Sequence, residues 1–346
     1  MSFLQKRKAV LAGTAFHYKA AVVTVAFLLY AGCSDPGFAH GETADSISEN
    51  AGDSTVSGPA AHAVSAADYA WPDLNYRPEH TIAARIAPPP GARRVKLDAG
   101  GFGSWLRHLP LKPGRPEVLL HDGRVKPNQA AHHAVIDIDT GARNLQQCAD
   151  AIMRLRSEYF FARNQGERIR FRFTDESEAR YDLWARGYRP LVRERRKTRW
   201  TRTAAADAGY EGFRAYLQNL FTYAGTYSLS RESVAIRSDE VRVGDFLIQG
   251  GFPGHAVLAV DMAEARTVDE DGRRARYVLL AQSYMPAQDM HVLRNPAGAS
   301  PWYQLEELPA PESPGADGET PGKPQQMKIQ TPEWKFSAQD WMRFRN

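Results

Sequence analysis

Three short apolar runs in the last third of the chain constrain its fold most strongly. They are VGDFLIQGG (residues 243–251), GHAVLAVDMA (254–263) and RYVLLAQS (276–283), and Gly-rich or charged turns separate them. Apolar runs of this length, bounded by turn residues, are typical of β-strands. Because no helical segment intervenes between them, they favour antiparallel pairing. The sequence therefore predicts an antiparallel sheet late in the chain.

Helices are predicted earlier in the chain. In NLQQCADAIMRLRSEYFFA (144–162), apolar residues recur at intervals of three and four, the spacing of an amphipathic helix, with Asn144 as its expected cap. A second helix is expected in EGFRAYLQNLFTYAGTYSL (211–229). The predicted fold class is therefore α+β, with the first helix as a central helix packed against the late antiparallel sheet.

Two polar segments between these elements admit more than one interpretation. HHAVIDID (132–139) alternates as a strand and places His133, Asp137 and Asp139 on one face, which could hold a divalent cation or be a solvated strand face. The second interpretation is favoured because no known zinc spacing is present, so no metal and no cofactor are expected. The arginine-rich segment 189–202 predicts a solvated hairpin arm, with binding to an anionic polymer as the alternative.

The N-terminal segment is typical of an exported protein. A basic start precedes the uncharged run AAVVTVAFLLYAG (20–32), which is too short for a comfortable membrane span. The residues before Cys33 resemble the lipobox of bacterial lipoproteins, which implies cleavage at Cys33 and attachment of a lipid there. The expected location is the membrane surface facing the periplasm or the outer envelope.

Composition divides the remainder of the chain. Residues 34–80 are rich in small and acidic residues without an apolar period, which predicts a disordered tether. Residues 81–346 are expected to form a single α+β domain with a Pro/Gly-rich insertion at 308–326. The formal net charge of +4 and the absence of a recognisable nucleic-acid-binding module argue against a nucleic-acid partner. The oligomeric state is left open.

Cys33 and Cys148 are the two cysteines of the chain. If Cys33 carries a lipid, Cys148 has no partner for an intramolecular disulfide. A lone thiol in an oxidising compartment is either buried or used chemically. The position of Cys148 on the apolar stripe of its helix favours a core cysteine. The polar residues His255 and Gln282, much later in the chain, favour a nucleophile. Both interpretations remain open.

A cysteine hydrolase needs a thiol, a base and a group that orients the base. Cys148 near a helix start, His255 at the head of an apolar strand and Gln282 at the end of the next strand supply these groups in order. This order resembles the papain-like superfamily, in particular the NlpC/P60 and CHAP cysteine amidases of cell walls. The resemblance implies a papain-like core in which Cys148 attacks, His255 acts as base and Gln282 holds the imidazole.

Three further residues are candidates for a supporting role. Gln147 could contribute to an oxyanion hole, and Asp261 and Ser283 could support His255 and Gln282. The chain departs from the NlpC/P60 pattern at Gln147 and Ala149, because that branch usually has Asp before the cysteine and Ser or Gly after it.

Several long motifs carry a closer resemblance. They are FGSWLRHLPL, LLHDGRVKPNQ, LQQCADAIMRLRSEY, YAGTYSL, GDFLIQGGFPGHAVLAVDMA, LLAQSYMPAQDMHVLRNP, SPWY and TPEWKF. Together they resemble the bacterial family known as domain of unknown function 4846, from about Thr81 to the last residue. This resemblance implies an envelope protein and no particular activity.

Two main hypotheses for function follow. The first is a lipid-anchored cysteine amidase or peptidase that acts on cell-wall peptide or another envelope amide. The second is a non-catalytic envelope lipoprotein that binds a glycan, a peptide or a protein partner. The position of the Cys148 sulfur relative to the His255 ring is expected to discriminate between them.

Overall fold

The computed structural model describes residues 64–345 apart from residues 73, 194–195 and 306–327. The predictions for the signal segment 1–33 with its Cys33, for tether residues 34–63 and for the insertion 308–326 therefore lie outside the described residues. The chain divides into two units, residues 1–57 and 58–346, and all described residues belong to the second.

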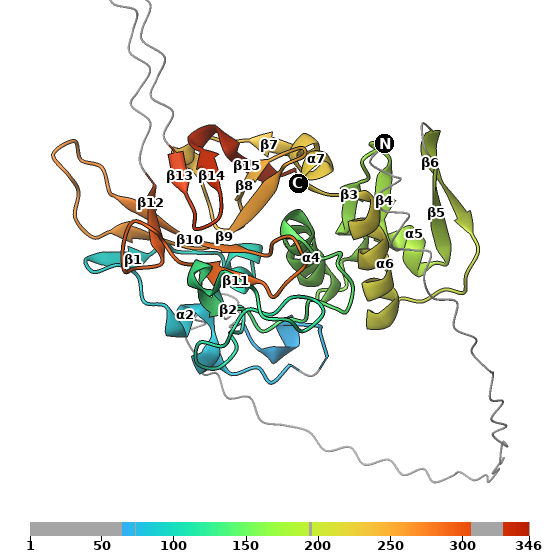
Figure 1. Cartoon of the computed structure of the whole chain (residues 1–346), viewed down its shortest axis with the longest axis horizontal. Coiled ribbons are helices and arrows are strands. Elements are labelled where there is room, and N and C mark those ends of the chain that lie inside the picture. The colour runs from blue at the N-terminus through green and yellow to red at the C-terminus, as the bar shows by residue number, and fades with distance from the viewer. Residues whose placement is uncertain (1–63, 73, 194–195, 306–327, 346) are drawn as a thin grey trace, which may run out of the picture. The chain divides into compact units, whose positions relative to one another are not determined.

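An antiparallel sheet of nine strands forms the centre of the domain (Figure 1). Its strands are β1 (Ala92–Arg94), β2 (His132–Val135), β7 (Ser233–Ala235), β8 (Phe246–Gln249), β9 (His255–Ala265), β10 (Arg276–Gln282), β11 (His291–Leu293), β12 (Trp302–Leu305) and β15 (Trp341–Phe344). The main path is β2-β11-β10-β9-β8-β15-β7, while β1 pairs with β9 and β12 pairs with β10. The three predicted strands are its centre, β8, β9 and β10, so the expected late antiparallel sheet is confirmed.

The helices complete an α+β fold. They are α2 (Ile82–Arg85), α3 (Phe102–Arg107), α4 (Cys148–Phe161), α5 (Tyr181–Ala185), α6 (Tyr210–Tyr223) and α7 (Thr226–Glu232). Short 3-10 turns lie at Ala66–Asp68, Pro78–His80, Gln129–Ala131, Gly166–Arg168, Ser238–Glu240 and Ala338–Asp340. The predicted central helix is α4, which packs against β9 and β10, and the second predicted helix is divided into α6 and α7. Among the described residues, no helix is long and apolar enough to cross a membrane.

Strand β9 is covered on both faces. Ala256, Leu258 and Val260 belong to the hydrophobic cluster that also contains Ile152 and Met153 of α4. The alternate residues Val257 and Ala259 belong to a second cluster together with Phe336 and Trp341. Since successive side chains of a strand point to opposite faces, a strand segment buried on both sides is apolar at every position, as residues 256–260 are.

The ordered domain begins before Thr81, which corrects the predicted tether of residues 34–80. Tyr69 and Trp71 are buried, and the Tyr69 hydroxyl donates to the Trp105 carbonyl at 2.9 Å. The Trp105 indole in turn donates to the Asp68 carbonyl at 2.7 Å. The prediction failed because the average composition of the segment concealed aromatic side chains near its end.

Three two-stranded hairpins lie outside the main sheet. They pair β3 (Arg170–Arg172) with β4 (Glu178–Arg180), β5 (Tyr188–Arg193) with β6 (Arg196–Arg202), and β13 (Lys328–Gln330) with β14 (Lys335–Ser337). The arginine-rich segment is the hairpin β5–β6, in which Arg199 and Arg202 are exposed, as expected for a solvated arm.

Asp261 is bound in the middle of β9, six residues beyond His255. Its fully buried carboxylate accepts from Arg94 Nε and Arg107 Nε, each at 2.6 Å. The carboxylate of Asp261 therefore binds these two arginines and does not support His255 as predicted. It connects β9 to Arg94 of β1 and to Arg107 of α3.

This ion cluster predicts a large stability difference between two carboxylates on the same strand. Asp261→Leu leaves two mostly buried guanidinium groups without a counter-charge and should lower the free energy of unfolding by about 3–5 kcal/mol. The matched control is Glu264→Leu, whose partner Arg93 is 59% exposed, and it should change stability by less than about 1 kcal/mol. Urea denaturation measures both, and equal effects would contradict the assignment.

Candidate functional site

The start of α4 differs from the sequence prediction. The N-cap is Gln147 rather than Asn144, and Cys148 is the first helical residue. The Asp150 carboxylate accepts the Gln147 backbone N–H at 3.1 Å, which closes the first turn. Asn144 lies outside the helix because its Oδ1 accepts the Ala287 backbone N–H at 2.7 Å. Cys148 therefore lies where helical N–H groups have no intrahelical partner.

Cys148 is a free cysteine that is 9% exposed. Burial, together with the nearby Asp150 carboxylate, raises the pKa of its thiol to about 12. Hydrogen bonds from the backbone N–H groups of Ala149, Ala256 and Cys148 itself oppose this pKa increase. Because Ala256 follows His255 in β9, the sulfur lies beside the strand that carries the imidazole. The resting thiol is protonated at neutral pH.

His255 and Gln282 meet at neighbouring ends of β9 and β10. The pairing of Ala281 with Leu258 sets the register that brings them together. His255 Nε2 lies 2.8 Å from Gln282 Oε1, and both residues are buried. The structure thus joins two of the three residues that the sequence suggested for catalysis.

Aromatic side chains hold the His255 ring in place. The Tyr284 ring lies 4.6 Å away in an edge-on arrangement, the Trp334 ring is tilted at 5.3 Å, and the Phe336 ring stacks at 5.9 Å. Burial lowers the pKa of His255 to about 4; the hydrogen bond that the ring donates to Gln282 opposes this decrease, and the positive charge of Lys126 adds to it. The imidazole is therefore neutral at pH 7.

The Cys148 sulfur contacts the residue after His255 but forms no hydrogen bond with the His255 ring in the described part of the chain. Within the described residues, the hydrogen bond of the His255 ring is the one made by Nε2, and none joins the ring to the Cys148 sulfur. Tyr284 lies near both residues: its ring packs on His255, and burial, the Glu333 carboxylate and the nearby Cys148 raise the pKa of its hydroxyl. The resting site is an uncharged thiol beside an uncharged imidazole.

A buried ion pair behind Gln282 was not found by sequence reasoning. Gln282 Nε2 donates to Glu333 Oε2 at 2.7 Å, and Lys126 Nζ donates to the same oxygen at 2.6 Å. Asn128 Nδ2 donates to Glu333 Oε1 at 3.2 Å. Lys126 and Glu333 lie 207 residues apart, so no local pattern indicates that they meet. The sequence marks each of them only by its place in one of the two motifs LLHDGRVKPNQ and TPEWKF.

The other predicted supporting residues have structural partners. The Ser283 hydroxyl lies 3.1 Å from the Gln146 carbonyl oxygen and 2.9 Å from the Gln288 carbonyl oxygen, and its single hydrogen is shared between these two acceptors, which join the end of β10 to the residues before α4. The Gln147 side-chain amide donates to Asn144 Oδ1 at 3.2 Å, and this bond accounts for it without an oxyanion. Both side chains therefore have contacts within the protein that explain their positions.

Asp139, one of the three residues considered for a cation, lies beyond the end of β2 and forms ion pairs. Asp139 contacts Arg154 at 2.6 Å and Arg214 at 2.7 Å. No group of three or more His, Cys, Asp or Glu side chains suited to a metal ion occurs among the residues that the structure describes. The arginines account for Asp139 without a bound ion.

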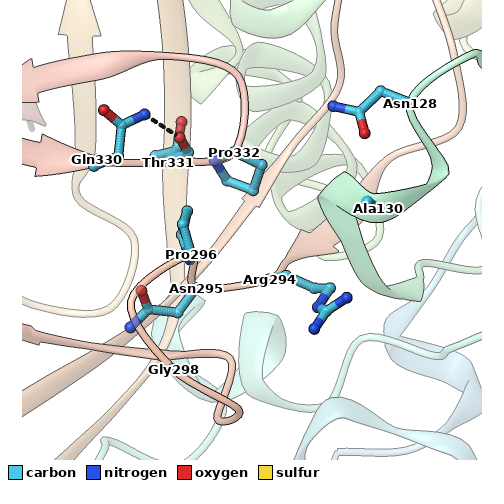
Figure 2. Close-up of a pocket in the computed structure, with 9 residues that line it drawn as sticks. All are labelled: Asn128, Ala130, Arg294, Asn295, Pro296, Gly298, Gln330, Thr331 and Pro332. Atoms are coloured by element: carbon cyan, nitrogen blue, oxygen red, sulfur yellow. Dashed lines mark hydrogen bonds between the residues drawn. The ribbon is translucent and has the colours of Figure 1, made fainter.

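A pocket of about 510 Å³ opens beside the Glu333 ion pair (Figure 2). Its lining mixes polar and apolar residues and consists of Asn128, Ala130, Arg294, Asn295, Pro296, Gly298, Gln330, Thr331 and Pro332. Cys148, His255 and Gln282 do not line it. Asn128 belongs to its wall and also donates to Glu333, so hydrogen bonds through Glu333 and Gln282 connect this wall to the His255 imidazole.

The buried imidazoles predict a loss of stability in acid. Burial is the main cause that lowers the pKa of His255 to about 4 and that of His291 to about 3. Each therefore contributes stability fully above about pH 6.5 and loses it as the pH falls toward the folded value. At pH 5 the free energy of unfolding should be lower than at pH 7 by about 2 kcal/mol per imidazole, measured by urea denaturation.

The variant His255→Gln isolates one of these contributions. Its free energy of unfolding should fall by about 2 kcal/mol less than that of the wild type between pH 7 and pH 5, because the residue no longer takes up a proton on unfolding. An equal fall in both proteins would show that His255 is not held neutral by burial.

Comparison with known proteins identifies the family and no relative of known function. No curated protein and no solved structure matches the chain. The sequence model of a family described as Domain of unknown function (4846) matches residues 82–314. This match covers more than half of the 346 residues and includes Cys148, His255 and Gln282, while Glu333 follows it. The chain therefore belongs to the family of domain of unknown function 4846.

Proposed function

We propose that this protein is a cysteine amidase or peptidase that acts on cell-wall peptide or another amide of the envelope. One arrangement carries the proposal: Cys148 begins α4 beside β9, and His255 at the head of β9 is bonded through Nε2 to Gln282. These residues offer a nucleophile, a base and a group that orients the base. The order and roles are similar to those of the NlpC/P60 and CHAP amidases.

The first half of the reaction forms a thioester. His255 Nδ1 takes the proton of the Cys148 thiol while the sulfur attacks the amide carbon, and the electron pair of the C=O bond moves to oxygen. The backbone N–H groups of the first turn of α4 stabilise this oxyanion. The C–N bond then breaks, and the amine leaves with the proton from His255.

The second half restores the enzyme. Water enters in place of the amine, gives a proton to His255 Nδ1 and attacks the thioester carbon. The C–S bond breaks, the acid is released, and the thiolate takes the proton back from His255. Both halves use the same nitrogen as base and then as acid.

The resting state favours neutral groups. Because burial raises the pKa of Cys148 to about 12 and lowers that of His255 to about 4, a thiolate–imidazolium pair is disfavoured while the site is closed. Reaction therefore requires opening, which admits the substrate and brings the sulfur to Nδ1. Two exposed apolar side chains flank this end of the sheet, Phe252 at 82% exposure and Met285 at 56%, and a substrate would meet them first.

Alkylation of Cys148 tests the nucleophile. In the full chain carrying Cys33→Ala, Cys148 is the single thiol, and iodoacetamide should label it without denaturant. In His255→Ala the second-order rate constant should fall at least ~10-fold, because a protonated thiol with no base is a poor nucleophile. Mass spectrometry of the intact protein measures both rates.

The control is His80→Ala, since His80 follows Pro78 in a 3-10 turn far along the chain from the site, and it should react as the wild type does. Labelling that occurs only after unfolding would overturn the proposal. In that case Cys148 is a core residue, and Cys148→Ala would cost about 1 to 2 kcal/mol of stability.

The burial of Cys148 favours a second candidate function. A non-catalytic envelope lipoprotein would need no accessible thiol, and the pocket of Figure 2 would offer it a place to bind a glycan, a peptide or a protein segment. This hypothesis predicts that Cys148→Ala leaves the cellular phenotype intact, which the hydrolase hypothesis does not allow.

We also propose that a lipid on Cys33 anchors the protein to the membrane, with the domain facing the periplasm or the outer envelope. The basic start, the uncharged run and the lipobox-like residues before Cys33 support this proposal. Cells grown with an alkyne-tagged fatty acid should label the wild type and Cys148→Ser equally. Label that persists in Cys33→Ser would contradict the anchor.

A further inference from the structure

We infer that Glu333 and His291 are positioning residues that fix the side-chain amide of Gln282, and thereby place the proton of the His255 ring on Nε2. The inference rests on the proposed function for its catalytic meaning, while the position of the proton is a property of the fold alone.

The carboxylate of Glu333 decides which way the amide of Gln282 faces. An ionised carboxylate accepts hydrogen bonds and donates none. The atom of Gln282 that lies 2.7 Å from Glu333 Oε2 must therefore be the NH₂ nitrogen. The amide oxygen then faces the other way, where it lies 2.8 Å from His255 Nε2.

His291 holds the second hydrogen of the same NH₂ group. Its Nδ1 lies 2.9 Å from the Asp289 carbonyl oxygen, which only accepts, so Nδ1 carries a hydrogen. Burial keeps the His291 ring neutral, with its pKa lowered to about 3, so Nε2 bears a lone pair. That lone pair faces Gln282 Nε2 at 3.4 Å. Two independent acceptors thus oppose rotation of the amide.

The consequence for His255 is a single tautomer. Gln282 Oε1 can only accept, so the neutral His255 ring must donate from Nε2 and has its lone pair on Nδ1. Nδ1 is then able to take the proton of a thiol. A reversed amide would offer an N–H to Nε2, move the ring proton to Nδ1 and remove the base.

Lys126 forms a buried ion pair with the Glu333 carboxylate. Its Nζ is 2.6 Å from Glu333 Oε2, and the side chains are 4% and 13% exposed. Burial lowers the pKa of Lys126, while the hydrogen bond that it donates to Glu333 opposes this decrease. A buried ion pair is retained only when its geometry and its hydrogen bonds offset the loss of water. Here Asn128 and Gln282 supply those additional bonds.

The experiment is the ¹⁵N spectrum of histidine-labelled full-length protein, in which the two ring nitrogens report the tautomer. Comparison with His255→Gln assigns the His255 signals. In the wild type we expect a protonated Nε2 and an unprotonated Nδ1. In Lys126→Met/Glu333→Leu, which removes both charges together, we expect a mixture of tautomers and an alkylation rate of Cys148 about 10-fold lower.

Two further variants sharpen the comparison. Glu333→Gln should retain the wild-type tautomer, because its amide oxygen still accepts from Gln282. Asn128→Ala removes a contact to the other carboxylate oxygen, Oε1, and should also leave the tautomer unchanged.

The outcomes separate this inference from the proposed function. A protonated Nδ1 in wild-type His255 overturns it, and so does a folded Lys126→Met/Glu333→Leu protein with unchanged tautomer and alkylation rate. If the double variant does not fold, the wild-type and Glu333→Gln spectra decide. A wild type with the expected tautomer but an unreactive Cys148 retains the positioning role and ends the hydrolase proposal.

Discussion

The rest of the domain depends on the pairing of β9 with β8 on one side and β10 on the other. This strand is buried on both faces, so a shift of its register by one residue would exchange the contents of two hydrophobic clusters. The same register sets the polar residues of β9 in place, with His255 at its head and Asp261 in its interior. The candidate site and the stability of the sheet therefore rest on one set of backbone hydrogen bonds.

The thiol of Cys148 is subject to two opposing effects. Its place at the first turn of α4 brings backbone N–H groups that favour a thiolate, whereas burial and Asp150 favour the neutral thiol, and burial has the larger effect. Desolvation dominates because the groups that would stabilise the charge are partial dipoles, whereas enclosure removes water altogether. This balance gives a protonated resting thiol, which would suit the oxidising compartment that the proposed export implies.

Sequence reasoning recovered the sheet and the central helix because their apolar patterns are local. It also paired His255 with Gln282, since strand ends that follow one another along the chain are brought together by antiparallel pairing. It misplaced the N-cap of α4. Asn144 is a good capping residue, but its side-chain oxygen accepts the backbone N–H of Ala287, which is far away in sequence. Glu333 was missed for the same reason, since its importance arises from contacts with distant residues.

The late position of residues 328–344 in the chain has a consequence for the order in which the candidate site forms. β15 inserts between β8 and β7, and the turn between β13 and β14 delivers Glu333 to Gln282. These segments leave the ribosome after all the other strands of the sheet. Contacts of such long sequence separation form late in folding. The His255 imidazole and the Gln282 amide therefore reach their final arrangement only after the last part of the chain has been synthesised.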